Sequence, residues 1–269
     1  MRQSVSCALG CALVVTFAAA ATDDEKAQWV TVKGQVVFPA DKVIPKRAAL
    51  AVNQDKPHCL AKGPLLDESV LVNPKTRGVK NVVVYLRPDN NNLPNAAFAA
   101  EEIHPADAKR KAEEVAIDQP CCVFVNRVTC ARVGDTLVVK NPAPVAHNFF
   151  WDSANNGTHN PTLAAKTDWK MPKPLAKEGP PIQYKCTIHG WMTGYVRVFD
   201  HPYYAVTDDD GTFEIKDAPA GKYRIVYWHE NGVRGGAKGR FGEPIQIALP
   251  PNAKTMEMTP TEFDVSPKG

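Results

Sequence analysis

The chain has 269 residues, 44% hydrophobic and 23% charged, a composition typical of a globular protein and unlike that of a disordered acidic or basic tail. Lys and Arg total 32 against 29 Asp and Glu, and no long basic run occurs, so nucleic acid is not expected as a partner. Proline is frequent, at 23 residues, and interrupts helices, which favours an all-β protein of one or two domains.

The N-terminal segment, residues 1–21, is predicted to be a secretory signal peptide. Arg2 lies in a short basic start, an apolar stretch runs from Val5 to Ala21, and the charged sequence TDDEK follows. A membrane-spanning helix needs about 20 apolar residues, which this stretch does not reach; an uncleaved anchor is the alternative. We therefore expect a periplasmic or secreted protein with no membrane insertion after the signal is removed.

Short β-type runs rich in Val, Ile, Tyr or Phe follow in chain order, separated by turn-rich stretches. They are Trp29 to Phe38, Asn81 to Leu86, Cys122 to Val125, Thr136 to Lys140, Ile182 to Lys185, Tyr195 to Phe199, Gly211 to Ile215, Lys222 to Trp228 and Pro244 to Ala248. Only Pro105 to Val115 has a helical pattern, and a solvated linker explains that stretch equally well.

Four residues that bind soft or borderline metals lie on two of the connections between these runs. His147 follows one predicted strand, while Cys186, His189 and Met192 form a C-x2-H-x2-M cluster between two later strands. Two imidazoles and a thiolate with a weak axial thioether suit both Cu(I) and Cu(II), as a mononuclear electron-transfer site requires. We expect one copper ion at these four residues; zinc in the same site and a chance grouping are the alternatives.

The residues from about Val115 to Asp200 resemble the cupredoxins, and within them the amicyanin and plastocyanin group of blue copper proteins. The resemblance rests on the short ligand spacing and on several flanking residues, namely Val133 to Thr136 (VGDT), Asn141, the His147-Asn148 pair and Tyr184 before Cys186. It implies a Greek-key β-sandwich holding one type 1 Cu(I)/Cu(II) ion. By the family pattern, the Asn148 side chain would hold the Cys186 loop.

The ligand loop also departs from that family. Ile188 and Gly190 stand where the amicyanin loop carries prolines, and Trp191 replaces its Phe. These differences leave the ligand set intact but put the redox partner and the tuning of the potential in doubt. The overall order of segments looks like that of bacterial periplasmic proteins labelled methylamine-utilisation or plastocyanin-like, and that label establishes no substrate.

A second resemblance concerns the sequence that flanks this region. Residues 206–228 are similar to carboxypeptidase regulatory-like (transthyretin-like) β-sandwich modules, whose opening strands would be Lys33 to Phe38 and Asn81 to Leu86, far upstream. We therefore expect a smaller discontinuous sandwich of residues 28–93 and 201–260, interrupted by a cupredoxin domain at 94–200. The alternative is that Trp29 to Leu86 adds strands directly to the cupredoxin.

Removal of the signal and assignment of Cys186 to the metal leave four cysteines in an oxidising compartment. Adjacent Cys121 and Cys122 would point to opposite faces of a strand, so they should have different partners. We favour a disulfide between Cys59 and Cys122, which would tie the flanking module to the insert, with Cys121 and Cys130 as the remaining pair. Free buried thiols are the alternative.

No Ser-His-Asp order, paired-carboxylate signature, HExxH motif or His-x-His pair is visible, so no enzyme is expected. A second metal site built from His58, His201 and His229 is a weak alternative to surface or hydrogen-bonding roles. The ligand set and the resemblance imply an exported protein that carries single electrons between redox partner proteins. The alternative is a copper-binding or delivery module whose smaller sandwich docks a partner or a cell-surface polymer.

Electrons are expected to enter at His189, the ligand nearest the end of the sandwich. Its ring edge should reach the surface inside an apolar rim formed by residues 142–145 and Trp191. Weak docking on such a rim would permit rapid turnover. Inward packing of Trp191 is the alternative.

Overall fold

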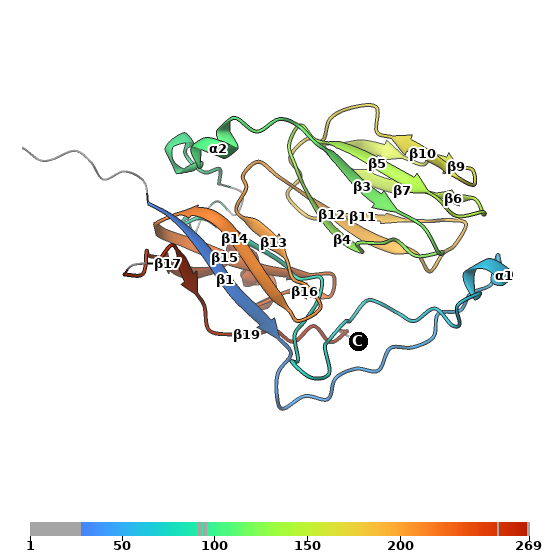
Figure 1. Cartoon of the computed structure of the whole chain (residues 1–269), viewed down its shortest axis with the longest axis horizontal. Coiled ribbons are helices and arrows are strands. Elements are labelled where there is room, and N and C mark those ends of the chain that lie inside the picture. The colour runs from blue at the N-terminus through green and yellow to red at the C-terminus, as the bar shows by residue number, and fades with distance from the viewer. Residues whose placement is uncertain (1–27, 91–92, 94–95, 252, 268–269) are drawn as a thin grey trace, which may run out of the picture.

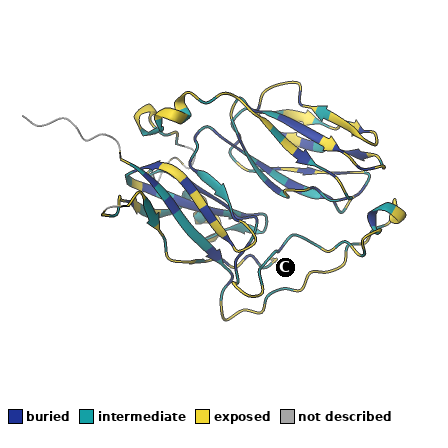
Figure 2. Cartoon of the chain, in the orientation of Figure 1, coloured by how far each residue is buried: buried dark blue, intermediate teal, exposed yellow. Residues whose placement is uncertain are grey.

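The computed structural model describes residues 28–267 except 91–92, 94–95 and 252. The predicted signal peptide lies outside the described residues. The predicted all-β fold class is confirmed, because the described chain consists mainly of short strands in several sheets (Figure 1). Figure 2 shows the buried residues concentrated on the strands and the exposed ones on loops and short helices.

One group of strands combines the two ends of the described chain. In its first sheet, β1 (Trp29–Val37) pairs with β14 (Thr212–Pro219), β18 (Thr255–Glu257) and β19 (Thr261–Glu262). In its second sheet, β2 (Val83–Pro88) pairs with β13 (Tyr204–Val206) and β15 (Gly221–His229), and β15 also pairs with β16 (Gly232–Val233) and β17 (Glu243–Ile247). A shared apolar core joins them; Val32, Leu86, Ile215 and Ile225 are among its members.

The second group consists of the strands between β2 and β13. One sheet contains β3 (Glu114–Asp118), β5 (Thr136–Asn141) and β10 (Thr167–Lys170). Another contains β4 (Val128–Arg132), β12 (Thr193–Phe199), β11 (Ile182–Lys185), β7 (Phe150–Ser153) and β8 (Gly157–His159). The short strands β6 (His147–Asn148) and β9 (Thr162–Leu163) form a separate pair. In β11 the buried Ile182 and Tyr184 alternate with exposed Gln183 and Lys185, the two-residue period that a half-buried strand requires.

The helices are short, and Pro105 to Val115 is only in part helical. Helix α2 (Pro105–Ala108) ends after one turn, and residues from Glu114 onward belong to β3, which pairs with β5. The remaining helices are α1 (Lys56–Cys59), η1 (Ala100–Glu102) and η2 (Gly236–Phe241). Among the described residues, no helix has the length and apolar character that crossing a membrane requires.

The predicted strand at Cys122 to Val125 is wrong. Only Val125 makes an isolated bridge, to Asp118, because Cys122 and Asn126 have left-handed backbone angles of φ 52° and 60°. A positive φ breaks the extended conformation of a strand. The regular strand β4 begins two residues after Asn126, at Val128.

The segment between β1 and β2 leaves the first group and extends alongside the second (Figure 1). It folds back on itself, since Leu50 N–H donates to the Leu65 carbonyl and Asp67 N–H to the Ala48 carbonyl. Leu65 packs against the core of the second group, as does Val52. We call residues 50–65, which include α1, the cap segment.

The predicted disulfide between Cys59 and Cys122 is confirmed, and it fastens the cap segment to the second group. The predicted pair Cys121 and Cys130 is wrong, because both are free thiols. Cys130 packs instead in the apolar interface between the two groups, where burial raises the pKa of its thiol to about 12.

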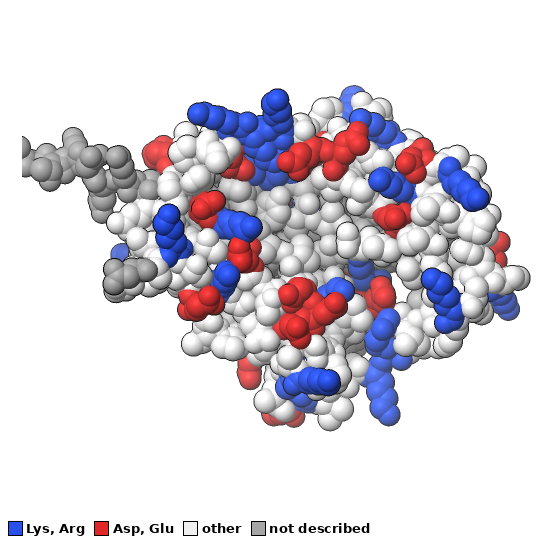
Figure 3. Space-filling view, in the orientation of Figure 1, with Lys and Arg blue, Asp and Glu red and all other residues white. Residues whose placement is uncertain are grey.

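The two groups of strands meet at a small interface with its own apolar cluster. Phe199 of β12 stacks on Tyr204 of β13 with ring centroids 4.4 Å apart. Beside it, Arg127 Nε donates to Glu230 at 2.5 Å, and both side chains are largely buried. Elsewhere on the surface, positive and negative side chains are interspersed, as Figure 3 shows for one face.

We predict that a chain ending at Asp200 aggregates. It would lack every strand from β13 onward, so β1 would lose its partner strands β14, β18 and β19, and β2 would lose both β13 and β15. Unpaired apolar edges promote association between chains. Size-exclusion chromatography of residues 22–200 beside residues 22–269 tests this, and a truncated chain as soluble and stable as the longer one would overturn the discontinuous sandwich.

We predict that His229 makes the chain less stable in acid. Burial, and next the nearby Arg127, lower the pKa of this imidazole to about 4. Between pH 6.5 and 4 the unfolded chain therefore binds a proton that the folded chain does not. As the pH is lowered through this range, the free energy of unfolding decreases by roughly 3 kcal/mol in total. Urea unfolding of the metal-free chains measures this decrease. Between pH 6.5 and 4, His229→Gln should lose roughly 3 kcal/mol less of its free energy of unfolding than wild type, whereas the control His159→Gln should lose as much as wild type.

Candidate metal centre

The hairpin between β11 and β12 provides three of the predicted ligands. Met192 N–H donates to the His189 carbonyl at 2.8 Å, and Cys186 N–H donates to the Met192 carbonyl at 3.2 Å, so the loop closes tightly on itself. Just beyond the loop, Tyr184 pairs with Gly194. A Cβ atom on Gly194 would lie 2.4 Å from the Tyr184 ring, so only glycine allows this aromatic side chain to pack there.

His147 comes to the same place from β6, at the end of the connection that follows β5. Asn141 holds that connection, because its side-chain amide donates to the carbonyls of Val145, Leu163 and Ala164 at 2.9, 3.2 and 3.0 Å. Its carbonyl oxygen accepts from Ala143 N–H at 3.1 Å. Asn141 therefore fixes both chain segments that precede and follow the strand carrying His147.

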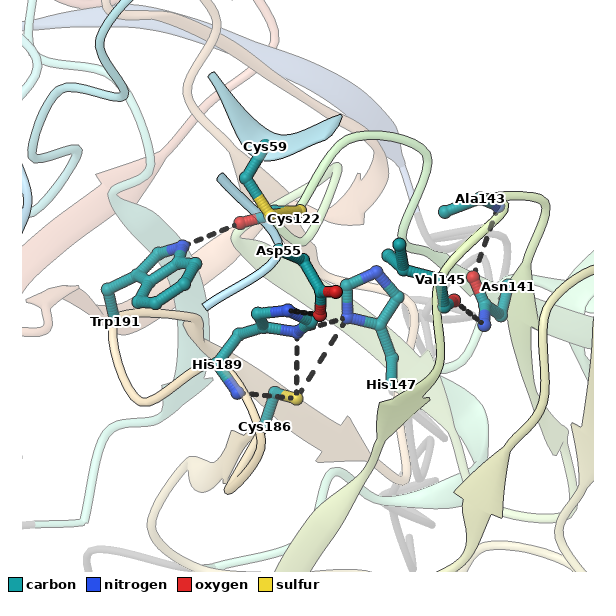
Figure 4. Close-up of a disulfide and its surroundings, with 10 residues drawn as sticks. All are labelled: Asp55, Cys59, Cys122, Asn141, Ala143, Val145, His147, Cys186, His189 and Trp191. Atoms are coloured by element: carbon teal, nitrogen blue, oxygen red, sulfur yellow. Dashed lines mark hydrogen bonds and ion pairs between the residues drawn. A yellow bond between two sulfur atoms is a disulfide. The ribbon is translucent and has the colours of Figure 1, made fainter. Parts of the chain in front are cut away.

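Three of the four predicted ligands converge (Figure 4). The Nδ1 atoms of His147 and His189 are 2.9 Å apart, and Cys186 Sγ lies 4.0 and 3.8 Å from them. A circle through these three atoms has a radius of about 2.1 Å, within the ~2.0–2.3 Å that imidazole nitrogen and thiolate sulfur keep from Zn²⁺. The donors therefore fit one small first-row metal ion.

Met192 lies on the same loop and is buried in the same apolar cluster as Cys186. Its backbone closes the loop, as described above. This placement is consistent with a weak thioether contact, and the four-residue ligand set stays a prediction.

Two backbone amides donate hydrogen bonds to the Cys186 sulfur. Asn148 N–H donates to Sγ at 3.4 Å and His189 N–H donates to it at 3.3 Å. The two amides belong to the segments that carry His147 and His189, so these hydrogen bonds fix the sulfur relative to both imidazoles.

The Asn148 side chain holds the Cys186 loop, in agreement with the role that the resemblance implied. Its Oδ1 accepts from Thr187 N–H at 2.5 Å and from Ile188 N–H at 3.3 Å, and from the Thr187 hydroxyl at 3.1 Å. One side chain adjacent to His147 therefore fixes the loop that carries Cys186 and His189.

Water is excluded from the donors. His147, Cys186 and His189 are each 0% exposed. Burial, with smaller contributions from His189 and His58, lowers the pKa of His147 to about 4, so this imidazole is neutral near pH 7. A neutral imidazole keeps the lone pair that a metal ion needs.

The expected exposure of His189 is wrong. Its ring edge is covered by the cap segment, where Asp55 Oδ2 lies 2.9 Å from His189 Nε2. Of the expected rim, Pro142 and Pro144 are exposed, whereas Ala143 is buried and Val145 is half-buried against the core. Trp191 is also half-buried, and its indole N–H donates to the Cys122 carbonyl at 3.0 Å, so it packs toward the disulfide.

The remaining histidines do not form a second site among the described residues. His201 and His229 are buried in the first group and its interface, and no metal-binding grouping joins either of them to His58. A different cluster does occur, because Cys59, Cys122 and His189 offer atoms within 4.8 Å of one another. Both sulfurs of that cluster are already bonded to each other.

Sequence reasoning missed Asp55. It lies 92 residues before His147 in a stretch without periodic pattern, and only the Cys59 disulfide, four residues later, indicates that this stretch approaches the second group.

No family model matches this chain, and no curated protein matches it. Several solved structures are similar to parts of it. An oxidised amicyanin variant is 22% identical over 36% of this chain and 90% of its own, with a TM-score of 0.28. A reduced amicyanin variant is 19% identical over 43% of this chain and 98% of its own, with a TM-score of 0.28. A purple cupredoxin from Nitrosopumilus maritimus is 20% identical over 33% of this chain and 100% of its own, with a TM-score of 0.27.

We predict that Asn148→Ala destabilises the metal-free chain by about 1–3 kcal/mol, because the Thr187 and Ile188 amides lose a partly buried acceptor. Urea denaturation measures the change. Asn155→Ala, which removes one hydrogen bond made by an exposed amide on the β7–β8 turn, is the matched control for loss of an Asn side chain. Equal stability of Asn148→Ala and wild type would show that the loop holds its conformation without Asn148.

Proposed function

We propose that the chain is an exported mononuclear type 1 copper protein of the cupredoxin kind that carries single electrons between redox partner proteins. The observation that carries this proposal is the buried triangle of His147 Nδ1, His189 Nδ1 and Cys186 Sγ, with sides of 2.9 to 4.0 Å. Two imidazoles and a thiolate are the donors of an electron-transfer copper site, and Met192 would add the weak axial thioether.

Copper bound there would supply one-electron redox chemistry. The chain's own contribution is to hold the donors in one arrangement. Asn141 fixes the approach of His147, Asn148 fixes the loop of Cys186 and His189, and the sandwich core excludes water from all three. A site that is already held in its final arrangement needs little rearrangement when its charge changes.

The delivery alternative is less well supported by the same burial. Copper delivery requires ligand exchange with a second protein. His147, Cys186 and His189 are each 0% exposed, so a second protein could reach their donor atoms only if the cap segment or the loop opened. Electron transfer to or from the site requires no such opening. The closed site therefore favours a carrier that keeps its metal.

The partners and the second module are also part of this proposal. We propose redox partner proteins, and a smaller sandwich of residues 28–93 and 201–260 that positions the copper module or docks a partner or a cell-surface polymer. Support for that module comes from the pairing of β1 with β14 and of β2 with β15, which joins residues on both sides of the 94–200 segment.

We predict that the purified chain binds one copper ion with an intense visible band, and that Cys186→Ser abolishes the band, because the thiolate is the source of the charge transfer. Cys130→Ala, which removes a free cysteine from the interface between the two groups, is the matched control and should keep the colour. Copper titration followed by visible spectroscopy makes the measurement. A Cys186→Ser chain that keeps the band would exclude the site.

A further inference from the structure

We propose that Asp55 is a positioning residue that fixes the His189 ring for metal binding from outside the ligand loops. The inference rests on the proposed copper site and adds to it a residue from the cap segment. The juxtaposition that carries it is the 2.9 Å contact between Asp55 Oδ2 and His189 Nε2 (Figure 4).

The two nitrogens of His189 face different partners. Nδ1 lies 3.8 Å from Cys186 Sγ and 2.9 Å from His147 Nδ1, whereas Nε2 faces the carboxylate. A neutral imidazole carries one N–H, and a carboxylate oxygen accepts hydrogen bonds. The proton therefore lies on Nε2, and the Nδ1 lone pair points toward the other donors, the arrangement in which an outer carboxylate orients a metal-binding histidine.

The other imidazole has no such partner. His147 Nε2 is buried without a hydrogen-bond partner among the described residues. The ring of His147 is held by packing and by the loop that Asn141 fixes, while the ring of His189 is held at its far nitrogen as well. Of the two proposed imidazole ligands, only His189 has its hydrogen position determined by an acidic side chain.

The backbone of Asp55 is held beside the disulfide, and the ligand loop contacts the same disulfide. The Asp55 carbonyl accepts from the His58 and Cys59 amides at 2.9 Å each, and Cys59 is bonded to Cys122. On the ligand loop, Trp191 donates to the Cys122 carbonyl and its ring lies 5.1 Å from that of His189. Asp55 is thus connected to the ligand loop through a disulfide rather than through flexible chain alone.

Charge gives the contact a second effect. The Asp55 side chain is 39% exposed while His189 is 0% exposed, so the carboxylate lies between the ring and solvent. A negative charge beside a ligand stabilises the more positive metal ion, here Cu(II) over Cu(I). Loss of this charge should raise the reduction potential.

Two substitutions separate the hydrogen bond from the charge. Asp55 has a left-handed backbone, φ 46°, and its side chain does not cap α1, so Asn and Gly are tolerated there without new strain. Asp55→Asn keeps an acceptor oxygen and removes the charge, whereas Asp55→Gly removes both. Asp217, another exposed aspartate with a left-handed backbone, φ 49°, on β14, provides the matched controls Asp217→Asn and Asp217→Gly.

The first measurement is made on copper-loaded full chains. We expect Asp55→Gly to bind Cu(II) about 10- to 100-fold more weakly than wild type. Both Asp55 variants should have a higher reduction potential, and both Asp217 variants should match wild type. If the Asp55 and Asp217 variants behave alike in affinity and potential, the proposal is overturned.

The second measurement does not depend on the copper chemistry. In the metal-free chain, the His189 Nε2 proton should give a ring N–H signal in nuclear magnetic resonance that exchanges slowly with water in wild type and Asp55→Asn, and rapidly in Asp55→Gly. Rapid exchange in wild type would overturn the proposal. A wild-type chain that lacks a coloured copper site but keeps the slow signal would instead refute the proposed function and leave the Asp55 contact established.

Discussion

Three electron-pair donors, all fully buried and held within 4.0 Å of one another, set the main constraint on this molecule. Burial of two imidazoles and a sulfur so close together is costly unless the surrounding chain cannot relax. The second group of strands meets that requirement by bringing the two connections that carry these donors to one end and fixing each with an asparagine side chain. Asn141 and Asn148 both use amide groups to replace backbone hydrogen bonds that irregular loops lack.

The two groups of strands are joined in a way that fixes their relation. The interface combines an apolar cluster with the Arg127–Glu230 ion pair, whose side chains are 13% and 7% exposed. A buried ion pair contributes little net stability, but removal of one partner leaves an uncompensated charge. The pair therefore disfavours any other packing of β4 against β15. In addition, the Cys59–Cys122 bond fastens the cap segment, which connects β1 to β2, to the second group five residues before Arg127.

Much of this could be predicted from sequence because the signals are local. The spacing of Cys186, His189 and Met192 is compressed into seven residues, and strands such as β11 alternate cleanly. The Cys59–Cys122 disulfide was favoured among the four cysteines left once Cys186 was set aside, but the same reasoning wrongly paired Cys121 with Cys130. The predictions that were wrong depended on long-range pairing or on backbone conformation. A left-handed φ at Cys122 interrupts the strand predicted there. Helix α2 ends after one turn, and the residues from Glu114 onward pair with β5 instead. The burial of His189 was missed because the covering residues come from an aperiodic segment before β2.

The strand pairing also has a consequence for the order in which the chain folds. Trp29 of β1 pairs with Pro219 of β14, and the other partners of β1 are β18 and β19, near the C-terminus. The partners within the second group lie nearer in sequence, from the β11–β12 hairpin to the β4–β12 pair, in which Val128 and Tyr195 are 67 positions apart. Contacts between residues close in sequence form faster than contacts that close long loops. We therefore expect the second group to fold before the first, because β1 can pair only after the last residues of the chain are available, and we expect the cap segment to close on a sandwich that has already formed.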